Sequence, residues 1–202
     1  IYAAGAKPRT LGLPGEEELV GRGVSYCALC DGPFFDGQDV AVAGGGNTAF
    51  EDALFLAGTC SQVTLIHRRD QFRGERRLVD QVERRENIRC WMDSTVEELL
   101  IRDGCLTGLR VRDGAAGEER ELDVDALFVA VGQEPRNRAL TDLLLLDEGG
   151  YVMAGEDCKA SLPGVFVAGD CRGKAVRQLT TAVGDGAVAG LAACRWVDEH
   201  QS

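Results

Sequence analysis

The sequence has little lysine, little histidine and no long apolar run. Of its 22 basic residues only Lys7, Lys159 and Lys174 are lysines, and there are two histidines. No apolar segment approaches the roughly 20 residues of a membrane-spanning helix, so we expect no membrane partner. A net charge of −11 argues against general nucleic-acid binding. At 202 residues, 45% hydrophobic, the chain is long enough for one large globular domain or two small ones.

Cysteine is plentiful but only one pair has the spacing of a motif. Cys27 and Cys30 are separated by two residues, and the other six cysteines are scattered. A chain of this length is not typical of a disulfide-rich secreted scaffold, and we expect a cytoplasmic protein. The scattered cysteines lie mostly in apolar surroundings and are predicted to be small buried hydrophobes. They are Cys60, Cys90, Cys105, Cys158, Cys171 and Cys194.

Residues 39–91 alternate between strand and helix patterns. An alternation of this kind favours parallel strands joined by right-handed crossovers, which is an α/β fold. A loop over 7–23, rich in glycine and proline, is predicted to be a linker. The predicted elements are strands at 39–43, 62–67 and 87–91, and helices at 48–57 and 71–86.

Later segments have other patterns. Three short alternating segments separated by aspartate–glycine turns predict an antiparallel meander over 95–124. Apolar runs predict buried strands at 126–131 and 165–168, a short strand at 151–153, and the end of a strand at 1–6. A long helix is expected from about 175 to 197.

A glycine-rich turn follows the strand at 39–43. Gly44, Gly46 and Ala49 have the spacing of the dinucleotide fingerprint. The first glycine permits a tight turn, the second lets the backbone approach a pyrophosphate, and the alanine permits close packing of helix on strand. Since the turn joins a strand to a helix, whose N-terminus favours phosphate, the pattern predicts a nucleotide site.

The end of the next strand indicates which nucleotide. An acidic residue there would bind the ribose 2′-hydroxyl of NAD, but this chain has His67, Arg68 and Arg69, with Arg73 following. Arginines at this position suit a 2′-phosphate and therefore predict NADP. The alternative is a solvated basic surface.

The spacing of Cys27 and Cys30 permits a small redox-active disulfide ring. Asp31 follows directly and could carry protons to and from a thiol during exchange. Half of a zinc site is one alternative, but zinc takes four ligands and the sequence has no second such pair. A coincidental pair of cysteines in a loop is the other.

Several independent segments together resemble the low-molecular-weight thioredoxin reductases. Residues 23–32 are similar to the active-site segment of that family, and 44–49 with 67–73 are similar to its NADPH site. Residues 127–132 resemble the strand that leads back to its flavin domain. Residues 164–170 and 177–179 resemble its C-terminal flavin-binding segment, so the likeness covers essentially the whole chain.

The resemblance implies an NADPH-dependent thioredoxin-disulfide reductase, usually a homodimer. Electrons would pass from NADPH through FAD to the Cys27–Cys30 disulfide and on to thioredoxin or a thioredoxin-like protein, with Asp31 as the acid. It also implies the cofactor-binding residues. They are Gly44, Gly45, Gly46, Asn47, Thr48, His67, Arg68, Arg69 and Arg73 for NADPH, Asp170, Arg177, Gln178 and Leu179 for FAD, and Gly132, which is not assigned to one of the two cofactors.

The implied fold is a Rossmann-like three-layer NAD(P)-binding domain with an antiparallel β-meander, plus the C-terminal part of an FAD-binding domain of the same type. We expect the NADPH domain, carrying the CxxC, at 10–133, and a remnant of the FAD domain at 1–9 and 134–202. The chain opens on Ile1, not methionine, and the N-terminal FAD fingerprint of the family is not in it. The FAD site is therefore expected to be incomplete, with NADPH bound but little FAD retained.

Two alternatives remain open. One is a related flavoprotein disulfide reductase that serves a peroxidase through an extra N-terminal domain; such relatives usually favour NADH, which the arginines oppose. The other is an isolated NADPH-binding module without activity.

Overall fold

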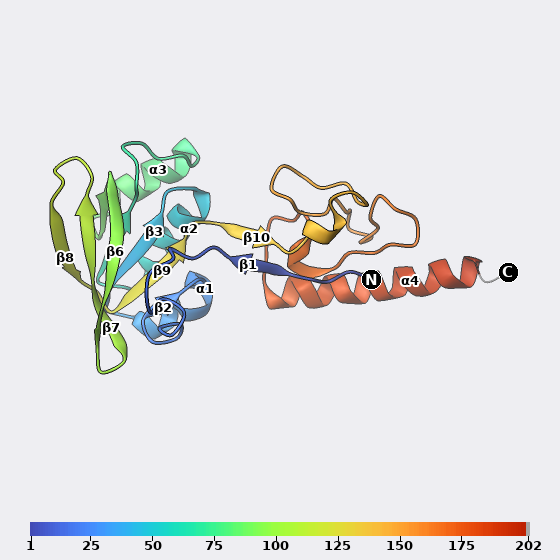
Figure 1. The fold of residues 1–202 in the computed structure, drawn as a ribbon, viewed down its shortest axis with the longest axis horizontal. Coiled ribbons are helices and arrows are strands. Elements are labelled where there is room, and N and C mark those ends of the chain that lie inside the picture. The colour runs from blue at the N-terminus through green and yellow to red at the C-terminus, as the bar shows by residue number, and fades with distance from the viewer. Residues whose placement is uncertain (201–202) are drawn as a thin grey trace. The chain divides into compact units, whose positions relative to one another are not determined.

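The computed structural model describes residues 1–200, which form two compact units (Figure 1). One unit is Arg9–Gly132, and the other combines Ile1–Pro8 with the chain from Gln133 onward. Within residues 1–200, none of the helices is long and apolar enough to cross a membrane.

A five-stranded parallel sheet forms the centre of the Arg9–Gly132 unit. The parallel pairing expected from the strand–helix alternation is confirmed. The two-residue strand that precedes Cys27 was not predicted, because so short a segment has no periodicity of its own. In spatial order the strands are β2 (Val24–Ser25), β9 (Ala126–Ala130), β3 (Asp39–Gly44), β4 (Gln62–Ile66) and β5 (Ile88–Trp91).

The sheet is the middle one of three layers. Helices α2 (Asn47–Leu56) and α3 (Arg76–Glu83) pack on one face, where Val40 and Val42 point. The alternate residues Ala41 and Ala43 point to the other face and pack against the antiparallel meander. The meander consists of β6 (Ser94–Arg102), β7 (Cys105–Asp113) and β8 (Glu119–Asp123). The predicted α/β three-layer fold with a meander is confirmed.

One predicted helix is shorter than expected. The helix predicted over 71–86 begins only at Arg76, so 71–75 is irregular. The Arg73 N–H donates to the Gly45 carbonyl at 3.0 Å, and the Glu75 N–H donates to the Asn47 Oδ1 at 2.8 Å. Because these N–H groups bond to the glycine turn and to α2, the segment 71–75 does not adopt helical geometry.

The second unit has little regular strand. Strand β1 (Ala6–Pro8) pairs antiparallel with β10 (Gln133–Pro135), followed by the short 3-10 helices η2 (Arg138–Leu140) and η3 (Gly169–Cys171) and the long helix α4 (Leu179–His200). The strands predicted at 151–153 and 165–168 are wrong as regular strands. Val152, Phe166 and Val167 are buried, but within residues 1–200 each forms only isolated bridges, because no neighbouring strand runs alongside them.

Helix α4 begins later than the predicted start at about residue 175. The Gln178 N–H donates to the Thr181 hydroxyl oxygen at 3.1 Å, which is a capping bond, and the residues before it are not helical.

The six cysteines outside the motif are divided by burial. Cys60, Cys158 and Cys171 are buried, as predicted, and Cys90 is half-buried. The prediction is wrong for Cys105 and Cys194, which are exposed. Cys105 is the first residue of β7 and lies at the end of a hairpin. Its side chain is exposed there although the neighbouring residues in the sequence are apolar.

Candidate active site

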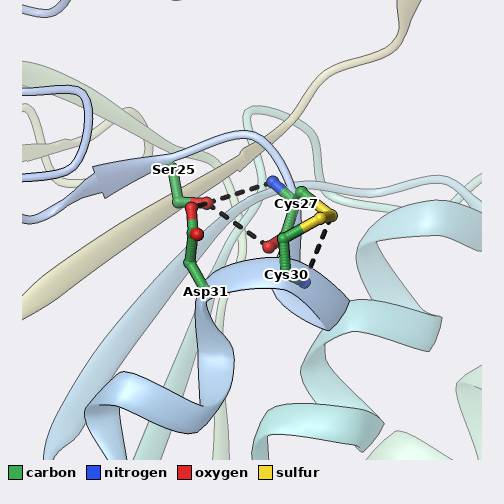
Figure 2. The surroundings of a disulfide bond; sticks show 4 residues. All are labelled: Ser25, Cys27, Cys30 and Asp31. Atoms are coloured by element: carbon green, nitrogen blue, oxygen red, sulfur yellow. Dashed lines mark hydrogen bonds between the residues drawn. A yellow bond between two sulfur atoms is a disulfide. The ribbon is translucent and has the colours of Figure 1, made fainter. Parts of the chain in front are cut away.

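A disulfide between Cys27 and Cys30 confirms the predicted pairing (Figure 2). The chain leaves β2 at Ser25, and Cys27 caps the one-turn helix α1 (Ala28–Asp31). The Cys30 N–H donates to the Cys27 sulfur at 3.2 Å, an interaction that favours negative charge on that sulfur. Cys30 is exposed and Cys27 is half-buried, so an incoming partner meets Cys30 more readily.

Asp31 lies beside the disulfide at the end of α1. The Ser25 hydroxyl donates to the Asp31 Oδ2 at 2.6 Å, and the Cys27 N–H donates to the same hydroxyl at 3.1 Å. Figure 2 shows these four side chains together, with Ser25 on the strand and Asp31 on the helix. A carboxyl group therefore lies next to the dithiol, where it can exchange protons during thiol chemistry.

The residue before the disulfide is held by a buried carboxylate. The Tyr26 hydroxyl donates to the Glu16 Oε1 at 2.8 Å, and Glu16 is 2% exposed. Burial and the hydrogen bond to Glu16 raise the pKa of Tyr26 far above its ordinary value. The N–H groups of Leu11, Gly12 and Leu13 also donate to Glu16, so this buried charge is well satisfied.

The glycine turn joins β3 to α2, and its geometry explains its composition. A Cβ on Gly44 would lie 2.5 Å from the Ala130 carbonyl oxygen and 2.7 Å from the Ala49 Cβ. A Cβ on Gly45 would lie 2.1 Å from the His67 ring, whereas a Cβ on Gly46 would meet nothing within 4 Å. The turn is therefore packed at its first two positions and open at Gly46, the N-cap of α2.

The basic residues after β4 have different environments. His67 is buried, and its ring stacks on Phe72 with centroids 5.6 Å apart. Arg68 and Arg73 are exposed, and Arg69 is half-buried. Within residues 1–200 none of these three guanidinium groups has an ion-pair partner.

The glycine turn and these basic residues line one cavity of about 610 Å³, formed entirely by residues of the Arg9–Gly132 unit. The nine residues predicted to bind NADPH all lie on its wall, and so does Gly132, which was predicted to bind a cofactor. Asn47 is less available than expected, because its amide is bonded through both ends to Glu75.

The residues predicted to bind FAD lie in the other unit. Asp170 is in η3, and Arg177, Gln178 and Leu179 lie just before and at the start of α4. Asp170 Oδ1 and Arg177 Nε are buried and have no hydrogen-bond partner within residues 1–200. The Arg177 guanidinium lies over the Tyr151 ring, 3.9 Å from its centroid. Such unsatisfied buried atoms fit a polar ligand.

Several residues at these sites were missed by sequence reasoning. Arg9, Thr10 and Leu11 line the nucleotide cavity, yet they lie in the segment predicted to be a linker. Ser25 and Glu16 form hydrogen bonds with Asp31 and Tyr26, and no local sequence pattern predicts these contacts. The run of glycine and proline around Glu16 was the only available signal that this segment makes specific turns. No group of three or more metal-ligating side chains was found within residues 1–200.

The chain is similar to known proteins over nearly its full length. The pattern of the family described as "Pyridine nucleotide-disulphide oxidoreductase" matches residues 1–186. The thioredoxin reductases of Listeria monocytogenes and Mycolicibacterium smegmatis are 42% and 45% identical to it, over 98% and 99% of this chain. The crystal structure of thioredoxin reductase from Streptococcus pyogenes superposes with a TM-score of 0.91 at 39% identity, over 98% of this chain. The chain spans 62% of the Listeria protein and 64% of the other two.

Proposed function

The chain belongs to the pyridine nucleotide-disulphide oxidoreductase family. On this basis we propose that it functions as a thioredoxin-disulfide reductase. The Cys27–Cys30 disulfide would be reduced with electrons from NADPH, with FAD supplying the transfer between them, and the resulting dithiol would reduce thioredoxin. The observation that carries the proposal is a CxxC disulfide with an adjacent carboxyl group. It lies in the same unit as a glycine-lined cavity, whose arginines have no ion-pair partner among residues 1–200. The homodimer and the cytoplasmic location stay predictions.

NADPH is the nucleotide that the cavity suits. The open position at Gly46 leaves room for a pyrophosphate at the N-terminus of α2. Arg68, Arg69 and Arg73 offer guanidinium groups for the 2′-phosphate that distinguishes NADPH from NADH. The peroxidase-serving alternative, which favours NADH, is opposed by these three cations.

FAD is assigned to residues of the second unit. Asp170 and Arg177 would hold the polar parts of the flavin nucleotide through Oδ1 and Nε, which have no hydrogen-bond partner in the described part of the chain. Gln178 and the exposed Leu179 would lie beside it. When bound, FAD supplies two-electron chemistry between a nicotinamide and a disulfide.

The cofactor assignment is tested by removing the arginines. The double variant with Arg68→Ala and Arg69→Ala should bind NADPH about 10 to 100-fold more weakly, because hydrogen bonds to a charged phosphate contribute about 1.5–3 kcal/mol. NADH affinity should be nearly unchanged. Fluorescence titration with both nucleotides measures the difference, and Arg77→Ala, on the exposed surface of α3, is the matched control. An equal loss of NADPH and NADH affinity would contradict the assignment.

The reductase assignment is tested at the disulfide. Because little FAD is expected to be retained, the assay contains added FAD in excess; under these conditions Cys27→Ser and Cys30→Ser should each abolish NADPH-dependent reduction of thioredoxin. Each variant should still pass electrons from NADPH to an artificial acceptor, because such an acceptor does not need the dithiol. A non-catalytic nucleotide-binding module predicts instead that neither substitution changes any activity of the protein.

A further inference from the structure

Ser25 makes contacts that connect the carboxyl group to the disulfide. Its side chain is buried at 3% exposure, and its hydroxyl lies 2.6 Å from the Asp31 Oδ2, 3.1 Å from the Cys27 nitrogen and 3.4 Å from the Cys27 carbonyl oxygen. A hydroxyl has one proton to donate, and the short approach to a carboxylate is the stronger bond. Ser25 therefore donates to Asp31 and accepts from Cys27.

The backbone of Ser25 is fixed by the parallel sheet. Ser25 ends β2 and pairs in register with Phe128 of β9, a strand at the centre of the core. Asp31, in contrast, ends a helix of only one turn, which has little rigidity of its own. The hydroxyl of Ser25 is thus a fixed point that can orient a side chain on a less rigid element.

We propose that Ser25 is a positioning residue that holds the Asp31 carboxyl group in place to protonate the thiolate that leaves the partner disulfide. The inference rests on the proposed function, in which the reduced dithiol attacks a disulfide of thioredoxin. One thiolate of the chain bonds to a partner sulfur, the partner S–S bond breaks, and the leaving sulfur takes a proton from Asp31. The second cysteine thiol then attacks the mixed disulfide, which re-forms Cys27–Cys30 and releases the second partner thiol. Two electrons pass from the dithiol to the partner, together with one proton from Asp31, which is left as the carboxylate, and one proton from the second cysteine thiol.

A leaving group that needs no proton separates this role from a structural one. A thioredoxin thiol is an ordinary alkyl thiol, whereas the thiol released from an aromatic disulfide such as 5,5′-dithiobis(2-nitrobenzoate) is acidic and leaves as the anion. A misplaced acid should slow only the first reaction. A distorted dithiol should slow both.

The experiment uses the full chain, reduced with dithiothreitol, freed of it and mixed with either disulfide without nucleotide or flavin. Asp31→Asn should lower the thioredoxin rate about 100-fold and Ser25→Ala about tenfold. Neither change should move the aromatic-disulfide rate by more than about twofold. In a double-mutant cycle, Ser25→Ala should have no further effect in the Asp31→Asn background, because both changes act on one group.

A second pair of variants keeps the test valid if Ser25→Ala does not fold. Ser25→Thr and Ser25→Val are nearly isosteric, and β-branched residues suit a strand. The hydroxyl of threonine should restore the thioredoxin rate, and valine should not. Equal rates for Thr and Val, an additive cycle, or equal slowing with both disulfides would each overturn the inference. A wild-type chain that fails to react with thioredoxin at all would instead contradict the proposed function.

Discussion

The environment of Asp52 in α2 disfavours the charged form of its carboxyl group. Burial and the neighbouring Glu51 carboxylate raise its pKa to about 6, from an ordinary value of 3.8. The folded state therefore binds a proton more tightly than the unfolded state. The favourable contribution of protonated Asp52 is fully present below about pH 4 and is lost as pH rises through about 6.

The prediction is that Asp52→Asn stabilises the chain at pH 7.5 by about 2 kcal/mol and changes little at pH 4. Asparagine keeps the shape and removes the charge that burial disfavours. Urea unfolding at both pH values measures this in a Trp196→Phe background, where Trp91 of β5 alone reports. Asp123→Asn, an exposed carboxylate on β8, is the control. A gain that is equal at both pH values would contradict the role of the buried charge.

At the scale of single residues, sequence reasoning reached the groups that follow a strand or share a motif. Gly46 and Arg69 could be placed at one site because neighbouring parallel strands end at the same edge of the sheet. Glu16 could not be placed, because its role depends on three backbone N–H groups and a tyrosine ten residues away. The pairing of Asn47 with Glu75 likewise depends on the folded path of 68–75.

At the scale of elements, the glycines of the turn between β3 and α2 have two different roles, one in packing and one in leaving space for a ligand. Gly44 has no room for a side chain, while Gly46 faces open space at a backbone angle that alanine adopts without strain. The first position is thus a packing requirement of strand on helix, and the second leaves space for a ligand.

We therefore expect Gly46→Ala to lower NADPH affinity at least tenfold without changing the melting temperature, since the added methyl group occupies the space for the pyrophosphate. Gly44→Ala should instead lower stability by about 1–3 kcal/mol through overpacking against β9 and Ala49. Calorimetry and nucleotide titration of both variants check the contrast. Unimpaired NADPH binding by Gly46→Ala would place the nucleotide elsewhere.

Elements with their own periodicity were predicted well, and those that depend on partners were not. Strands β3 and β4 and helix α2 combine an apolar pattern with clear end signals. The apolar run over 165–168 is equally clear, but a regular strand also needs a neighbouring strand, and among the described residues Val167 forms an isolated bridge with Tyr2 and no ladder. The first residues of the helix predicted at 71–86 are not helical, because their N–H groups bond to the glycine turn and to Asn47. Sequence periodicity cannot predict these hydrogen bonds.

At the scale of the whole molecule, the two units differ in how much of a core each one contains. The Arg9–Gly132 unit has two apolar clusters, one on each face of its sheet, and both are built only from its own residues. The other unit has two smaller clusters, around Val152 and Phe166, and α4 exposes Leu179, Val183 and Leu191. A unit of 124 residues with a sheet covered on both faces has the size and core of an independent domain.

The last prediction follows from this division. A polypeptide of residues 9–132 should fold alone and bind NADPH within about threefold of the full chain, because every residue on the wall of the nucleotide cavity belongs to it. The Cys27–Cys30 dithiol of that polypeptide should exchange with thioredoxin at the rate of the reduced full chain, because Ser25 and Asp31 are also within it. Titration calorimetry and stopped-flow fluorescence measure the two properties. A folded 9–132 polypeptide that binds NADPH tenfold more weakly would show that residues outside the unit contribute to the site.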